Sequence, residues 1–181
     1  MKKIFCALLF VTVILSACSM PVASPQPPPT ATTQAPSTPR PEDCGYQWAQ
    51  KDLPELSKSF QGSLQALQSE AQARAYAFGE NCMLADGSVG GFSAMETDFN
   101  VTLTVTDLTN ESDLGGWVVK VMQVIQSIPK DQLEGPQPGR VMIIFQSGSD
   151  QKIVNFYINQ YQALPPGLSN SEIFQKLQIP P

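Results

Sequence analysis

The spacing of apolar residues predicts two amphipathic helices in the C-terminal three quarters of the chain. In both, apolar residues recur every three or four positions, which is typical of a helix with one buried face. The first is expected from an N-cap at Asp52 to about Ser69, with the stripe Leu53, Leu56, Phe60, Leu64 and Leu67. The second is expected to open at Asn110–Asp113 and to stop at Pro129, with the stripe Leu114, Trp117, Val121, Ile125 and Ile128.

Strand patterns lie between and after these helices. Residues 95–106 alternate strictly, with Phe99, Val101, Leu103 and Val105 on one side and Asn100, Thr102 and Thr104 on the other, which predicts a strand with one wet face. Residues 72–80 are expected to form the strand before it. Residues 141–145 and 152–161 predict a hairpin around Gly148-Ser149-Asp150. A capping box from Ser169 to Glu172 predicts a short final helix over residues 171–177.

These elements predict an α+β domain with a four-stranded antiparallel sheet and two helices on one face. A shift of 61 residues lays the stripe of the first helix onto that of the second, and each helix is followed by two predicted strands. The order α-β-β-α-β-β could therefore arise from a duplicated helix-hairpin unit with pseudo-twofold symmetry. The alternative is that any two amphipathic helices align on their stripes.

The N-terminus has the three parts of a secretory signal. Lys2 and Lys3 precede an apolar run over residues 4–15, which is too short to span a bilayer, and small residues follow. The segment ends in Leu15-Ser16-Ala17-Cys18. This motif resembles the lipobox of bacterial lipoproteins. The resemblance implies removal of residues 1–17, a diacylglycerol on Cys18 and extracytoplasmic attachment to a bacterial membrane.

The residues after Cys18 predict a disordered tether. Residues 19–41 consist almost entirely of Pro, Thr, Ser, Ala and Gln, with eight prolines and no aromatic residue, so they cannot bury enough apolar surface to fold. The expected organisation is a signal peptide over 1–17, a lipid-anchored linker over 18–41 and one domain over 42–181, long enough for a single hydrophobic core.

Cysteine usage predicts one disulfide. Cys6 leaves with the signal and Cys18 takes the lipid, so Cys44 and Cys82 remain in an oxidising compartment and are expected to pair. Neither a histidine nor a Cys-x-x-Cys motif supports a metal site in their place.

Composition excludes several functions. The chain has no histidine, which excludes Ser-His-Asp and Cys-His catalysis and imidazole zinc sites. Removal of Lys2 and Lys3 leaves nine basic residues, scattered singly, against 16 acidic ones, so nucleic acid is not an expected partner. We therefore expect neither a cofactor nor a metal.

A glycine-rich loop over residues 81–91 is the predicted binding site. Apolar residues stand among its glycines where a simple connector would carry polar ones, and Cys82 would fix one end. The candidate residues, which extend just past the loop, are Met83, Leu84, Asp86, Val89 and Phe92. The wet strand face of Asn100, Thr102 and Thr104 could contact a sugar or a protein, although solvation alone explains it. Aromatic residues that could stack on a ligand are Tyr46, Trp48, Tyr157 and Tyr161.

The sequence thus predicts a non-enzymatic, lipid-anchored envelope protein whose monomeric domain binds a protein partner. Two alternatives stay open. One is a protein that binds a small molecule or glycan in a cleft beside the glycine-rich loop, and the other is a carboxylate-based hydrolase. A flat apolar patch favours the binding of a protein partner, and a concave pocket favours the binding of a small molecule or glycan. Clustered acids with shifted pKa values favour the hydrolase.

Overall fold

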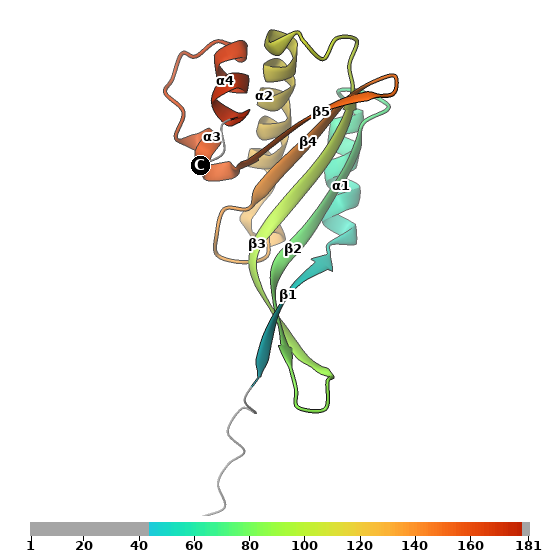
Figure 1. Cartoon of the computed structure of the whole chain (residues 1–181), viewed down its shortest axis with the longest axis vertical. Coiled ribbons are helices and arrows are strands. Elements are labelled where there is room, and N and C mark those ends of the chain that lie inside the picture. The colour runs from blue at the N-terminus through green and yellow to red at the C-terminus, as the bar shows by residue number, and fades with distance from the viewer. Residues whose placement is uncertain (1–43, 179–181) are drawn as a thin grey trace, which may run out of the picture. The chain divides into compact units, whose positions relative to one another are not determined.

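The computed structural model describes residues 44–178, which form one mixed β-sheet with helices packed on one of its faces (Figure 1). The predicted α+β class is confirmed. The signal peptide, Cys18 and the linker lie outside the described residues.

The sheet has five strands in sequential order, and all neighbours pair antiparallel except β3 and β4, which are parallel. The strands are β1 (Gly45–Asp52), β2 (Gln72–Met83), β3 (Val89–Thr104), β4 (Arg140–Ser147) and β5 (Asp150–Tyr157). The predicted four-stranded antiparallel sheet is therefore wrong. It lacks β1, and the long connection through the second helix returns the chain parallel to β3, as a helical crossover does. The pseudo-twofold duplication, which required an antiparallel sheet, is wrong as well.

The helices are α1 (Pro54–Gln65), α2 (Glu111–Ser127), α3 (Ile158–Gln162) and α4 (Asn170–Gln178), with a short 3-10 turn over Lys130–Gln132. The hairpin after α2 is confirmed, but it turns at Gly148 and Ser149, and its second strand stops at Tyr157, where α3 takes over.

The start of α1 differs from the prediction. Asp52 is the last residue of β1 and its carboxylate binds Arg74, so Leu53 takes the N-cap position and has no side-chain cap. Pro54 fits the first turn because its missing N–H would have no helical partner there. The helix ends at Gln65, before the predicted Ser69, and Leu67 is 49% exposed.

The caps of α2 and α4 agree with the sequence. Asn110 caps α2 by accepting the backbone N–H of Asp113 on its side chain. At α4 the backbone N–H of Ser169 donates to Glu172 at 2.8 Å, and the N–H of Glu172 donates to the Ser169 hydroxyl at 3.4 Å, which is the predicted capping box.

The core lies between the helices and one face of the sheet. Ala73, Ala75 and Ala77 on β2 are small enough for α1 to pack closely over them, while the larger core residues come from β3, β4 and β5. The largest buried side chains are Phe60, Phe99, Phe145, Phe156, Phe174, Leu64, Leu103, Leu114, Met122 and Ile143. Because strand side chains alternate, the remaining residues form a second face on which none of the described helices packs.

Beyond Ala77, the ends of β1, β2 and β3 extend past the helices as a narrow arm (Figure 1). We define the arm as residues 45–49 and 79–95. A β-bulge at Phe78/Gly79 marks its root. A side chain at Gly79 would overlap the backbone carbonyl of Ser93, so only glycine fits there. The arm replaces the predicted loop over residues 81–91, because both strands run on until only residues 84–88 form a turn.

Candidate functional site

The uncovered face of the sheet carries a band of polar and aromatic side chains. Strand register aligns Tyr76 with Asp98, and on the far side Arg140 with Tyr157. Asp98 and Arg140 are joined across the parallel pair, because the Asp98 carboxylate accepts the backbone N–H of Arg140 at 2.7 Å. The band therefore crosses from β2 to β5.

A small cleft of about 150 Å³ lies in this band. Its walls combine two aromatic rings, one thioether, one carboxylate, one guanidinium and three carboxamides. These are Tyr76 and Phe78 from β2, Asp98 and Asn100 from β3, Arg140 and Met142 from β4, and Gln50 and Asn155 from the flanking strands. Asp98 is the carboxylate among the described residues that line the cleft, and its side chain hydrogen-bonds to that of Glu96.

Two acidic residues of β3 on this face are buried. Asp98 is 2% and Glu96 7% exposed. Burial raises the pKa of Glu96, and the charge of Asp98 raises it further. Burial also raises the pKa of Asp98, although the hydrogen bond from the Arg140 backbone N–H opposes the rise. Burial, followed by the charge of Asp98, raises the pKa of Tyr76.

Arg140 is incompletely satisfied. Its Nε–H is buried and has no hydrogen-bond partner within the described structure. The guanidinium lies over the Tyr157 ring, 5.5 Å from the ring centroid. This contact stabilises the positive charge but gives the Nε–H no hydrogen-bond acceptor. An unpaired buried donor costs about 1–3 kcal/mol. Such a group calls for an explanation, and a missing ligand is one.

The predicted binding residues gather at the end of the arm. Met83 ends β2 and pairs with Val89, the first residue of β3. Asp86 stabilises the turn between them by accepting the N–H of Ser88 at 2.9 Å and its hydroxyl at 2.6 Å. The two hydrogen bonds lower the pKa of Asp86. Phe92 differs from the rest of the set because it packs against the core.

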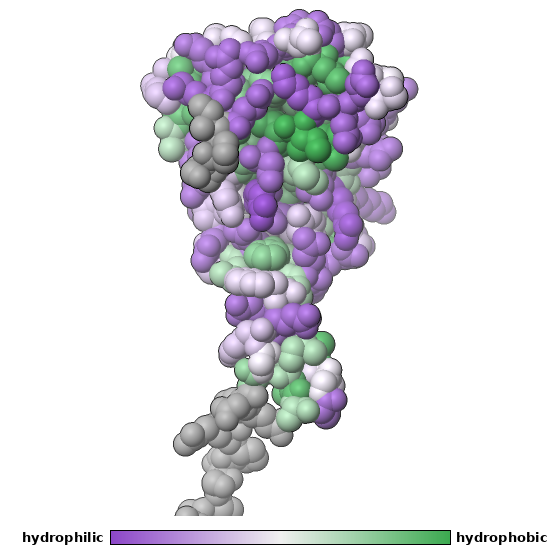
Figure 2. All heavy atoms as spheres, in the orientation of Figure 1, coloured by the Kyte–Doolittle hydropathy of each residue, from purple (hydrophilic) through white to green (hydrophobic). Residues whose placement is uncertain are grey.

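The arm exposes large apolar side chains. Tyr46 is 70%, Trp48 60% and Val89 55% exposed, and Trp48 stacks on Phe78 with ring centroids 5.3 Å apart. The only charged residues of the arm are Glu80 and Asp86. Figure 2 shows apolar surface at the end of the arm, and also apolar patches on the otherwise hydrophilic body.

The predicted disulfide is confirmed. Cys44 and Cys82 are bonded, with 5.0 Å between their Cα atoms. The bond ties the first described residue to the part of β2 that lies in the arm. It therefore fixes β1, an edge strand that pairs with β2 alone among the described strands, at the end that carries the exposed Tyr46.

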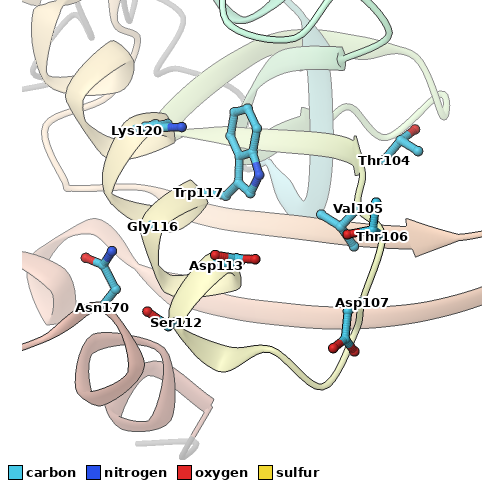
Figure 3. A pocket seen from close by; sticks show the side chains of 10 residues that line it. All are labelled: Thr104, Val105, Thr106, Asp107, Ser112, Asp113, Gly116, Trp117, Lys120 and Asn170. Atoms are coloured by element: carbon cyan, nitrogen blue, oxygen red, sulfur yellow. The ribbon is translucent and has the colours of Figure 1, made fainter.

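A larger pocket of about 400 Å³ lies beside α2. Figure 3 shows the indole of Trp117 projecting between α2 and residues 104–107. Lys120 lies 4.2 Å from the centre of the Trp117 ring. The carboxylates are already occupied, because Asp107 accepts two bonds from Thr109 and Asp113 accepts the side-chain amide of Asn110. The two carboxylates of this pocket therefore serve the start of α2, and we give the pocket no binding role.

The other sequence candidates lie in different places. Asn100 lines the cleft, whereas Thr102 and Thr104 lie farther along β3, away from it. Tyr161 packs near Phe156 at the edge of the core. Sequence reasoning missed Tyr76, Phe78, Asp98 and Arg140. A usable signal was present in residues 73–78, where three alanines alternate with arginine, tyrosine and phenylalanine, a pattern that puts the large side chains on the face away from the helices.

Comparison with known proteins gives no assignment, since no family, curated protein or solved structure matches the chain. None of the described helices is long and apolar enough to cross a membrane. Among residues 44–178, no group of three or more cysteine or acidic side chains is placed to hold a metal ion.

Proposed function

We propose that the protein is a non-enzymatic, lipid-anchored module of a bacterial cell envelope that binds a protein partner through its arm. The diacylglycerol on Cys18 holds the chain on the membrane, and the proline-rich segment up to Pro41 separates the folded domain from it. The arm is the part of the domain that makes the contact.

The observation that carries this proposal is the exposure of Tyr46, Trp48 and Val89 on one protruding element. Aromatic residues are enriched at protein interfaces, where an apolar ring and a polar tip both find partners. Exposed apolar groups gathered in one place are also more informative than single ones scattered over a surface.

The backbone of β1 supports the same proposal. β1 pairs with β2 on one side and with no described strand on the other, so its outer N–H and C=O groups can accept an added strand. Edge strands are usually protected by charged side chains, especially lysine. Residues 45–50 carry no charge, and Lys51 comes only at the inner end of the strand, where its ammonium group pairs with Glu134 at 2.9 Å.

The anchor is tested by the intact mass of the protein isolated from membranes. The proposal expects a chain that begins at Cys18 and carries at least the mass of a thioether-linked diacylglycerol, and it expects Cys18→Ala to prevent both the modification and the cleavage. An unmodified mature N-terminus at any other residue contradicts the anchor, while leaving partner binding by the arm to its own test.

The interface is tested by comparing two exposed apolar substitutions. Val89→Ser removes a 55% exposed side chain from the arm, and Ile153→Ser removes a 49% exposed one from the opposite edge strand. Both variants are expected to keep the free energy of unfolding within about 0.5 kcal/mol of wild type, as surface changes usually do. Only Val89→Ser, alone or with Tyr46→Ser, is expected to weaken recovery of the partner after reversible crosslinking in membranes. Equal recovery by the two variants would contradict the assignment of the interface to the arm.

Leu84→Ser is a less clean test. Leu84 is half-buried, and a side chain at Gly90 would lie only 2.9 Å from Leu84 Cδ2, so the leucine packs against the facing strand. Loss of folding in this variant would show a structural role for Leu84 and would leave the Val89 comparison unaffected.

A further inference from the structure

The cleft on the open sheet face combines groups of opposite hydrogen-bonding character. Asp98 supplies a carboxylate that already accepts the Arg140 backbone N–H and hydrogen-bonds to Tyr76 and Glu96, so only part of its accepting capacity is open to a ligand. Arg140 supplies N–H groups that can only donate, including the buried Nε–H that has no partner in the described structure. Asn100 and Asn155 each supply a carboxamide that both donates and accepts. An anionic ligand would meet Asp98, and a cationic ligand would meet Arg140.

We propose that this cleft binds one ring of a carbohydrate through two neighbouring hydroxyl groups. A hydroxyl both donates and accepts, so one hydroxyl of the pair can accept from Arg140 while its neighbour donates to Asp98. A neutral ligand of this kind satisfies both charged side chains without placing a like charge beside either. The site is separate from the end of the arm and does not depend on partner binding there.

Size and apolar lining agree with a sugar ring. The volume of about 150 Å³ is well below the roughly 300 Å³ at which drug-sized pockets begin, so the cleft admits one small ring. Tyr76, Phe78 and Met142 provide apolar surface for the C–H groups of that ring. Exposed Trp48, which stacks on Phe78, continues the aromatic surface outward and would contact the next sugar of a chain.

The Arg140 Nε–H signal in ¹H–¹⁵N NMR of the full chain tests the proposal. The chain is held in a detergent without a sugar headgroup and titrated with the methyl glycosides of glucose, galactose, mannose and N-acetylglucosamine. At least one glycoside should shift this signal saturably, together with the side-chain amides of Asn100 and Asn155. The same glycoside lacking one hydroxyl of the recognised pair should bind at least about tenfold more weakly.

Variants at the rim separate binding from folding. Asn155 is exposed and lines the cleft, whereas Gln146 is exposed on the same face but outside it. Asn155→Ala should weaken the bound glycoside about five- to tenfold, and Gln146→Ala should leave its affinity unchanged. Arg140→Lys should abolish saturable binding while backbone spectra stay folded. If Arg140→Lys loses the folded spectrum, the Asn155 and Gln146 pair decides alone.

A tetrasaccharide of the best glycoside distinguishes a free sugar from a glycan chain. Tighter binding that also shifts the Trp48 indole signal identifies a chain, and equal affinity with no Trp48 shift identifies a monosaccharide. The proposal is overturned if none of the glycosides shifts the Arg140 signal saturably. It is also overturned if Asn155→Ala and Gln146→Ala bind equally.

Discussion

The carboxylate of Asp98 accepts the backbone N–H of Arg140 at 2.7 Å, across the one parallel strand pair of the described sheet. Burial nevertheless raises the pKa of Asp98, although this bond, the charge of Arg140 and side-chain hydrogen bonds with Glu96 and Tyr76 all oppose the rise. The stability of the domain should therefore depend on the protonation of this group and of its neighbour Glu96.

The sign follows from the direction of the shifts. Glu96 and Asp98 both have raised pKa values in the folded protein, so folding favours their protonated forms. The two carboxyl groups add most to the free energy of unfolding below their unfolded pKa values, near pH 4. This stabilisation is lost as the pH rises through their folded pKa values. Asp98→Asn keeps an oxygen that accepts from Arg140 but cannot ionise. We expect the free energy of unfolding of this variant, measured in urea, to fall less steeply above pH 4 than that of wild type.

Asp86 serves as a control because its pKa is shifted in the opposite direction. Two hydrogen bonds from Ser88 lower its pKa, so its stabilising contribution is present above the unfolded pKa and is lost as the pH falls through the folded one. Asp86→Asn should therefore change the pH dependence only on the acid side. If Asp98→Asn leaves the slope above pH 4 unchanged, the buried carboxyl groups do not control it.

How far the sequence predicted this molecule can be judged from individual elements. Both main helices were predicted because their stripes place Phe60, Leu64, Leu114 and Val121 in the core. β1 was missed because an edge strand of an exposed arm buries almost nothing, so its side chains show no burial-driven alternation. The parallel pairing of β3 and β4 was missed because strand order depends on contacts between distant residues, which local patterns do not record.

The candidate site was predicted only in part. The disulfide between Cys44 and Cys82 followed from counting cysteines in an exported chain. The sequence predicted a loop over residues 81–91, whereas the structure has the end of a hairpin there, with Val89 as the first residue of β3. Arg140 and Asp98 are 42 residues apart, and only the crossover through α2 brings them into one band.

The close crossing of α2 and α4 requires a glycine at position 115. A Cβ at Gly115 would overlap the backbone carbonyl of Asn170, which cannot move without shifting α4. Gly115→Ala should therefore destabilise the domain by about 1–3 kcal/mol, the usual cost of overpacking, despite the better helix propensity of alanine. Thermal and urea unfolding measure the effect.

Gly116→Ala is the matched control for this prediction. The nearest atom to its added Cβ is Asn170 Nδ2 at 3.1 Å, at the far end of a flexible and exposed side chain. This variant should be neutral or slightly stabilising. Equal destabilisation by the two substitutions would show that the close approach of α4 is not the cause.

Gly62 offers a stabilising substitution. It lies on the exposed side of α1, and an added Cβ meets no atom within 4 Å. Gly62→Ala should raise the free energy of unfolding by about 0.5–1 kcal/mol, because glycine loses more backbone entropy in a helix. A lower free energy of unfolding in urea would mean that Gly62 does not lie on the exposed side of α1.

The disulfide should stabilise the arm more than the rest of the sheet. The two cysteines are 38 residues apart, and a loop of this length corresponds to about 4 kcal/mol in the chain-entropy model, an upper-end figure. Replacing both cysteines by serine should lower the melting temperature and speed hydrogen exchange in β1. In β4 and β5, at the other side of the sheet, hydrogen exchange should change only as much as the global free energy of unfolding requires. If β1 exchanges no faster relative to β5, the bond does not fix the edge strand.

The most direct test of partner binding by the arm is photo-crosslinking in intact cells. A photoreactive amino acid is placed at Val89 on the arm, at Ile153 on the opposite edge of the sheet, or at Leu67 after α1, three positions of similar exposure (55%, 49% and 49%). The account predicts a discrete protein adduct from Val89 that is lost when Tyr46 is replaced by serine, and none from Ile153 or Leu67. No protein adduct from Val89, or the same adduct from all three positions, would contradict it.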